Sequence, residues 1–154
     1  MNDGKLTRLL LSAQNLEDIH VLSSLTQDSI LLVEDTKWFK KKHRFTLLLS
    51  RFKWELSQEN REVEAQSQRC LSTLIFDNVT DVSCRGLENA LENRILSLLT
   101  IEVEEGKNTD DLKIYLIFAG NTTIKLRVEL IQAYLKDIVG TNRVSSKVVH
   151  GHEK

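Results

Sequence analysis

The sequence contains no proline, and this absence excludes two kinds of segment. Proline-rich linkers and proline-rich recognition motifs both depend on the extended conformation that proline imposes, so neither is present. Long apolar runs are missing too. No stretch reaches the roughly 20 apolar residues that a membrane-spanning helix needs, and the apolar run at Leu9, Leu10 and Leu11 is too short for a signal peptide. We therefore expect a protein without a transmembrane segment that stays in the cytoplasm.

Cysteine is scarce as well, since the chain has only two, Cys70 and Cys84. They fall on segments that we expect to pair as strands across a turn at Asp77 and Asn78. In that register Cys84 lies opposite Leu71, so the two sulfurs point to opposite faces and a disulfide is not expected. Neither cysteine has histidines nearby that would complete a zinc site, and both thiols are expected in the core.

Neither sign of charge is in excess, because 21 lysines and arginines face 22 aspartates and glutamates and the formal net charge is -1. This balance gives no strong nucleic-acid signal, although it leaves room for a local basic patch. The 154 residues suit one domain. We predict a single globular domain over residues 1–140 and a flexible tail over residues 141–154, where no periodicity is found.

The first clear element is a helix that begins at Asn15. The asparagine side chain can accept hydrogen bonds from the free amides of the first turn, and Asp18 stands where the acid of a capping box would. One face of this helix should be buried, because apolar residues recur at helical spacing. These residues are Leu16, Ile19, Leu22 and Leu25.

From Ile30 onward the apolar pattern changes to the period of two that is typical of strands. Two pairs of tight-turn residues are present, Asp77 with Asn78 and Gly120 with Asn121. The predicted strands cover residues 30–39, 44–55, 69–76, 79–85, 94–104 and 111–119, with a return strand after Asn121. On the strand over 94–104 we expect one shared face, made by Ile95, Leu99, Ile101 and Val103.

A second helix is predicted over residues 129–139, with Gly140 as its left-handed C-cap. The fold class is therefore α+β, with an antiparallel β-rich core of about seven strands, an N-terminal helix and a C-terminal helix. This element order is similar to that of the pleckstrin-homology-like superfold, in which a final helix plugs two packed sheets. The apolar stripe of the second helix consists of Leu130, Ile131, Tyr134, Leu135 and Ile138.

Four separated segments carry a family resemblance, over residues 15–28, 44–55, 95–101 and 116–129. In this order they resemble a family of small bacterial proteins catalogued as domain of unknown function 2948, and the resemblance extends from about Leu6 to Val139. It implies a bacterial, single-domain, cytoplasmic protein. It implies no activity, ligand or partner, so no functional residue is carried over from it.

Basic residues gather at one turn, which we call the basic hairpin, residues 37–44. Trp38 and Phe39 are interleaved with the cations, which would attract phosphate groups of lipid headgroups or nucleic acid. The alternative is a solvated turn whose lysines keep an edge strand from aggregating, with both aromatics in the core. The candidate ligands for an anion are Lys37, Lys40, Lys41, Lys42 and Arg44, together with Arg51 and Lys53 on the following strand.

No motif for catalysis is found. The segment Cys84-Arg85-Gly86 lacks a supporting histidine, and no Gly-rich phosphate loop exists. His150 and His152 lack a fixed third ligand for a metal. We therefore assign no catalytic, metal or cofactor residue, expect no cofactor, and expect that the chain is not an enzyme.

Three functional hypotheses follow. The leading one is a non-enzymatic binding or adaptor domain that recognises a protein partner through open strand edges or a groove beside the last helix. The alternative is binding of an anionic surface, phospholipid headgroups or nucleic acid, through the basic hairpin. The third is an enzyme whose pocket is assembled from distant residues. A homodimer formed through an edge strand or through Trp38 and Phe39 also stays open.

Overall fold

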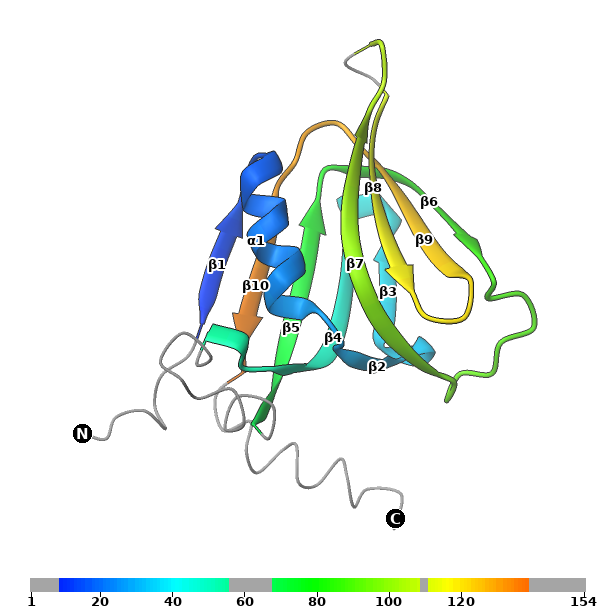
Figure 1. The fold of residues 1–154 in the computed structure, drawn as a ribbon. Coiled ribbons are helices and arrows are strands. Elements are labelled where there is room, and N and C mark those ends of the chain that lie inside the picture. Colours follow the sequence, from blue (N-terminus) through cyan, green and yellow to red (C-terminus); the bar gives the residue numbers. More distant parts are fainter. Residues whose placement is uncertain (1–8, 56–67, 109–110, 139–154) are drawn as a thin grey trace.

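The computed structural model describes residues 9–55, 68–108 and 111–138 (Figure 1). These residues form ten strands in one antiparallel sheet, one α-helix and short 3-10 turns. The predicted α+β class with helices at both ends is therefore wrong. In chain order the elements are β1 (Leu10–Ala13), α1 (Leu16–Thr26), β2 (Ile30–Leu32), η2 (Val33–Asp35), β3 (Thr36–Phe39), η3 (Lys40–Lys42), β4 (Arg44–Phe52), β5 (Arg69–Asp77), β6 (Val79–Arg85), β7 (Ile95–Glu105), β8 (Leu112–Phe118), β9 (Thr122–Val128) and β10 (Ala133–Asp137).

The sheet folds back on itself. Its strand order is β1-β10-β5-β4-β2-β7-β8-β9-β6, with β3 also paired to β4. Because β5 runs directly into β6 and β9 leads into β10, the β5–β10 pair continues as the β6–β9 pair. At this corner Asp77 N donates to Gln132 O over 2.9 Å and Glu129 N donates to Asn78 O over 3.0 Å. We call β1, β10, β5, β4 and β3 the first sheet, and β7, β8, β9 and β6 the second sheet; β2 bridges them.

The corner at Asp77 and Asn78 corrects a prediction, since β5 and β6 do not form a hairpin. Asn78 has φ +62°, a left-handed conformation that asparagine tolerates better than most residues. It sends the chain out of the first sheet and into the second. Cys84 consequently lies opposite Ile124 of β9, not opposite Leu71.

The predicted C-terminal helix is also wrong. Residues 133–137 form β10, which lies between β1 and β5. The buried positions recur every second residue, at Ile131, Ala133, Leu135 and Asp137, and Leu130 is 53% exposed. The apolar residues of this short segment fit both a helical period and a strand period. The segment forms a strand because the edge of β5 is open for pairing. Without that helix the similarity to the pleckstrin-homology-like order does not hold. Gly140 and the predicted tail lie outside the described residues.

The N-terminal helix is confirmed together with its cap. Asn15 Oδ1 accepts from Asp18 N over 2.8 Å, and Asp18 Oδ2 accepts from Gln14 N over 2.9 Å, which is a reciprocal capping arrangement. The helix buries Ile19 and Leu22, whereas Leu16, expected on the same buried face, is 42% exposed. It lies against β7 and also contacts β1, so it covers the inner side of the first sheet where the two sheets diverge (Figure 1).

The core lies between the inner faces of the two sheets and α1. The predicted alternation is confirmed in β8 and β9, whose buried residues lie directly opposite one another. In β7 the register shifts between Leu98 and Thr100, so Leu96, Leu98 and Ile101 point inward. Ile95 and Leu99 are exposed, and the predicted shared face is therefore wrong for these two.

The segment predicted as one strand over residues 30–39 is interrupted by η2. Ile30 of β2 pairs with Ser50 near the end of β4, whereas β3 pairs with the beginning of β4. Between β2 and β3 the chain lies beside the residues that precede β7, and Val33 N donates to Arg94 O over 3.0 Å. The interruption lets β2 bond to β4 on one side and to β7 on the other.

Candidate functional site

The tip of the basic hairpin is η3, which joins β3 to β4. Its three lysines, Lys40–Lys42, are exposed and have no carboxylate of the described residues within ion-pair distance. Phe39 beside them is 42% exposed. His43 has φ +54°, and its backbone accepts from Val79 N over 2.9 Å. The hairpin tip is therefore fixed to the start of β6 while its lysines stay free.

The structure separates the remaining predicted ligands. Lys37 is exposed and its Nζ donates to Glu34 O over 3.5 Å. Arg44 binds both oxygens of Asp77, at 2.7 and 3.1 Å, and this hydrogen bonding raises the pKa of Arg44. Lys53 is half-buried beyond the other end of β4. Lys37 and the three lysines of η3 are thus the cations that the hairpin leaves without a carboxylate partner.

Arg51 does not lie on this surface. It alternates with Phe45, Leu47 and Leu49 on the inner face of β4, and its side chain is 0% exposed. Its Nε and Nη2 donate to the two oxygens of Asp137, each over 3.0 Å. Its Nη1 and Nη2 also donate to Glu55, over 2.9 and 2.8 Å. Two carboxylates therefore neutralise the guanidinium inside the protein.

Asp137 of β10 connects this arginine to β5 and to the residue that precedes β1. It accepts from Ser72 Oγ of β5 over 2.6 Å and from Leu9 N, next to β1, over 2.9 Å. Burial by itself would raise the pKa of Asp137, but hydrogen bonds from Arg51, Ser72 and Leu9 outweigh it and the pKa is lowered. The pKa of Glu55 is lowered as well, because the hydrogen bonds and charge of Arg51 outweigh its burial. We call Arg51, Glu55, Ser72 and Asp137 the Arg51 cluster.

The two cysteines lie on different sheets and are both free. Cys70 is buried in β5, as expected of a core thiol, whereas Cys84 of β6 is exposed and the expectation for it is wrong. Burial raises the pKa of both thiols. Within the described ranges, no group of three or more His, Cys, Asp or Glu side chains could hold a metal ion.

The outer faces of the two sheets differ in chemistry. In the centre of the first sheet, the outer face presents apolar side chains and side chains with hydroxyl groups. The register identifies them, because residues opposite each other on paired strands share a face. These central residues are Thr46, Leu48, Ser50, Leu71, Thr73, Ile75 and Tyr134, and all seven are half-buried. On the second sheet each of the outer rows contains at least one charged residue, and one row, of Glu104, Lys113, Arg127 and Asp81, is charged throughout.

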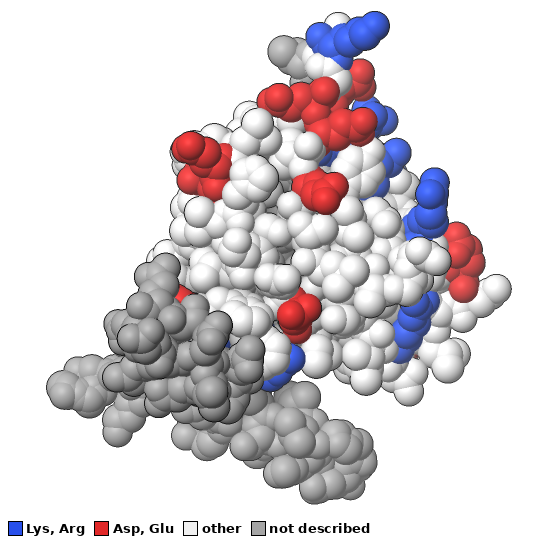
Figure 2. Space-filling model, in the orientation of Figure 1, with Lys and Arg blue, Asp and Glu red and all other residues white. Residues whose placement is uncertain are grey.

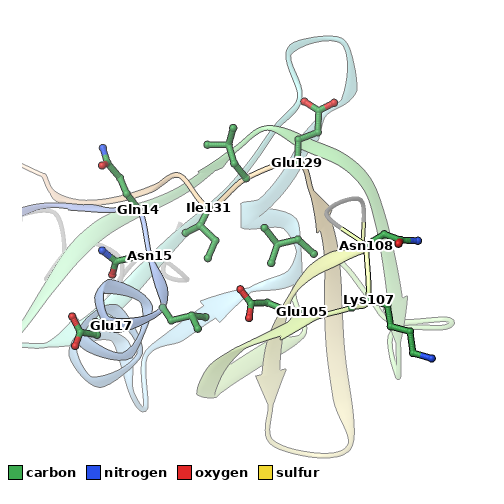
Figure 3. Close-up of a pocket in the computed structure, with 12 residues that line it drawn as sticks. Gln14, Asn15, Glu17, Glu105, Lys107, Asn108, Glu129 and Ile131 are labelled. Atoms are coloured by element: carbon green, nitrogen blue, oxygen red, sulfur yellow. The ribbon is translucent and has the colours of Figure 1, made fainter.

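A groove opens at one rim of the molecule, where α1 begins, where β7 turns into β8, and where the chain passes from β9 to β10. We call it the rim groove. It has a volume of about 860 Å³ and is lined by residues 14–17, 105–108, 112 and 129–131. Figure 3 shows Glu105 and Ile131 pointing into the space between α1 and the β7–β8 hairpin, whereas Lys107 points away from it.

The rim groove has an apolar floor and acidic edges. Leu16 and Leu130 are 42% and 53% exposed there. The carboxylates of Glu17, Glu105 and Glu129 have no cation of the described residues within ion-pair distance. Figure 2 shows acidic side chains gathered near the end of the molecule where β7 and β8 meet, with basic side chains at the tip and along the adjacent side. The sequence did not predict this groove, because its walls come from three distant segments and one of them was assigned to a helix.

The described residues define a small antiparallel β-sheet protein with one covering helix. The model of the family described as "Protein of unknown function (DUF2948)" matches residues 9–150, and the chain belongs to that family. The predicted resemblance is thus confirmed. No curated protein and no solved structure matches the chain. Among the described residues, α1 and the 3-10 turns are too short or too polar to cross a membrane.

Proposed function

We propose that this protein is a non-catalytic binding domain of the cytoplasm that recognises a protein partner through the outer face of its first sheet. The observation that carries the proposal is the difference between the two outer faces. Water solvates the charged rows of the second sheet, whereas Leu48, Leu71 and Ile75 lie in the middle of the first sheet without a charged neighbour in their cross-strand rows on β4 and β5. Apolar centres with polar edges are typical of protein interfaces.

The edges of this face indicate the chemistry of the partner. Lys37 and Lys136 lie in the outer rows of β3 and β10. Arg69 lies 3.9 Å above the ring of Phe52, and its Nη1 donates to Ser50 O over 2.8 Å. These cations favour an apolar partner surface with acidic edges. They also disfavour pairing of this face with a second copy, because like charges would meet.

Substitution in the centre of the face tests the proposal. Ile75→Glu places a carboxylate among apolar neighbours, and the matched control Ile117→Glu makes the same change on the outer face of the second sheet. Tagged proteins are used as bait in lysate of the source organism, and captured proteins are identified by mass spectrometry. We expect wild type and Ile117→Glu to capture the same protein and Ile75→Glu to lose it by at least about tenfold.

Equal capture by the two variants would show that another surface binds the partner. Thermal unfolding of each variant confirms that the fold is kept. Capture that responds to Ile75→Glu and also weakens at high salt agrees with an acidic partner surface.

A second candidate function rests on the exposed lysines of η3 and on Phe39 beside them. We propose binding of anionic phosphate surfaces by the basic hairpin as this alternative. It predicts that wild type sediments with vesicles rich in phosphatidylserine or with DNA, less at high salt, and that Lys40→Glu/Lys41→Glu/Lys42→Glu abolishes the binding. Unchanged sedimentation of the triple variant would eliminate this candidate.

A further inference from the structure

The walls of the rim groove are held in place by the fold. Its α1 side is fixed by the hydrogen bonds from Asp18 N to Asn15 Oδ1 and from Gln14 N to Asp18 Oδ2. Its hairpin side is closed by the bond from Gly106 N to Asp111 O, at 3.1 Å. Its third side follows the corner where Glu129 N bonds to the chain between β5 and β6. A ligand therefore meets a formed groove and does not have to assemble one.

The groove favours a cation that carries an apolar group. Helix N-termini attract anions through their free amides, but here the cap uses the Asp18 amide, and Glu17 adds a carboxylate. Glu105 and Glu129 add two more carboxylates around the exposed side chain of Leu130. An anionic ligand would be repelled, whereas lysine side chains next to an apolar side chain would match both the edges and the floor.

The chain itself presents a segment with this chemistry, at the tip of the basic hairpin. Phe39 is 42% exposed and is followed by the three unpaired lysines of η3. Lys113 lies 3.9 Å from Glu104 and Arg127 lies 3.4 Å from Asp111, whereas the unpaired cations elsewhere on the described surface, such as Lys107, Lys125 and Lys136, do not lie in a run beside an exposed aromatic ring. Residues 39–42 do not line the groove of their own molecule, and η3 is held against β6. The contact must therefore form between molecules.

We infer that the rim groove binds the basic hairpin of a second copy of this chain, with Phe39 on its apolar floor and the lysines of η3 at its carboxylates. The two surfaces are different, so the contact is heterologous. It closes into a dimer if both hairpins find the opposite groove, and otherwise extends to a ring or a chain. This inference uses neither the outer face of the first sheet nor its partner, and it stands separately from the proposed function.

Sedimentation velocity on the purified full chain tests the contact at concentrations up to roughly 1 mM. We expect the average mass of wild type to rise with concentration in about 50 mM salt and to return to that of the monomer in about 500 mM salt. Glu105→Lys/Glu129→Lys in the groove and Lys40→Glu/Lys42→Glu in the hairpin should each lower the association constant by at least about tenfold.

Two control pairs repeat these charge changes on other exposed surfaces. Glu88→Lys/Glu92→Lys lies in the connector before β7, and Arg85→Glu/Lys125→Glu lies on the outer face of the second sheet. Both should associate as wild type does. The variant that combines the groove and hairpin changes has the net charge of wild type and opposite signs on both surfaces, so it should regain association.

Three results would overturn the inference. One is a wild type that stays monomeric in low salt. The second is a groove variant that associates as wild type does. The third is a control pair that weakens association as much as the hairpin and groove pairs do, because the effect would then reflect net charge alone. Since Ile75→Glu leaves both surfaces intact, it should associate normally, and this separates the inference from the proposed function.

Discussion

At the scale of single residues, the position of a cation on its strand decides what it can do. Arg44 and Arg51 lie on the same strand but on opposite faces, one exposed beside Asp77 and the other enclosed with Asp137. A buried arginine with two carboxylates contributes little net stability by its presence, because desolvation offsets the attraction. Removing Asp137 leaves the buried guanidinium with Glu55 alone, whose side chain is 36% exposed, and two hydrogen bonds to a buried carboxylate are lost.

We therefore expect Asp137→Asn to lower the free energy of unfolding by about 1.5–3 kcal/mol. The amide can still accept from Ser72, but it no longer balances the guanidinium of Arg51. Urea unfolding followed by circular dichroism measures the change. Asp81→Asn, at an exposed position of β6, is the control and should change stability by less than about 0.5 kcal/mol. Similar losses of stability in the two variants would contradict the expectation that Asp137 stabilises the buried Arg51.

The same residues predict how stability depends on pH. The folded protein holds the pKa values of Asp137 and Glu55 below their ordinary values of 3.8 and 4.5, so the unfolded chain binds protons more readily. Their contribution is present above the unfolded pKa values and is lost as pH falls through the folded ones. The urea midpoint of wild type should thus decrease from about pH 5 downward. Asp137→Asn should show a shallower decrease; an equal slope would assign the acid sensitivity to other groups.

At the scale of elements, the elements that depend on nearby residues were predicted correctly. Elements whose form depends on distant strands were not. Asn15 and Asp18 are adjacent to the helix they cap, and Gly120 with Asn121 closes a hairpin between neighbouring strands. Both are decided by interactions within a few residues. Asn78 is equally good turn chemistry, but whether it makes a hairpin or a corner depends on β9 and β10, which come some 50 residues later.

The candidate sites divide in the same way. The exposed lysines of η3 follow from a run of like charges, which must remain solvated wherever the chain places it. The alternation of Phe45, Leu47 and Leu49 indicates which face of β4 is inside, and extending it by two residues places Arg51 inside too. The rim groove could not be predicted, because nothing near Glu105 in the sequence reports that α1 lies beside it.

The connector after β6 provides a test at this scale. Gly86 has φ +86°, and a Cβ there would lie 2.6 Å from Asn121 O and 3.0 Å from Thr122 Cα, both of them backbone atoms. Gly120 has φ +81° but no atom within 4 Å of a Cβ. Both Gly→Ala variants carry the left-handed strain of about 1–2 kcal/mol. Gly86→Ala should lose at least about 1 kcal/mol more, because backbone must also move.

Thermal and urea unfolding of the two alanine variants make the comparison. The difference between them isolates the close approach of the connector to the β8–β9 turn. Equal losses would mean that the connector moves aside without cost.

At the scale of the whole molecule, the continuous pairs at the corner join the two sheets into one unit. The β5–β10 ladder cannot open without disturbing the β6–β9 ladder, since the same two chain segments form both. We expect the amides of Leu74 in β5 and Leu126 in β9 to exchange with solvent hydrogen at free energies within about 1 kcal/mol of each other. Native-state hydrogen exchange at increasing denaturant concentration measures both. A lower value for one sheet would show that it opens independently.

The pairing of β1 with β10 sets a limit on how the chain can fold while it is being synthesised. Leu10 pairs with Lys136, and Leu9 N reaches Asp137 across nearly the whole sequence. A growing chain can form the β8–β9 hairpin as soon as both strands have left the ribosome, because those contacts are local. Until residue 137 emerges, however, β5 lacks its β10 neighbour and Arg51 lacks its Asp137 partner. Completion of the fold therefore awaits the synthesis of β10, and the nascent chain carries an open sheet edge until then.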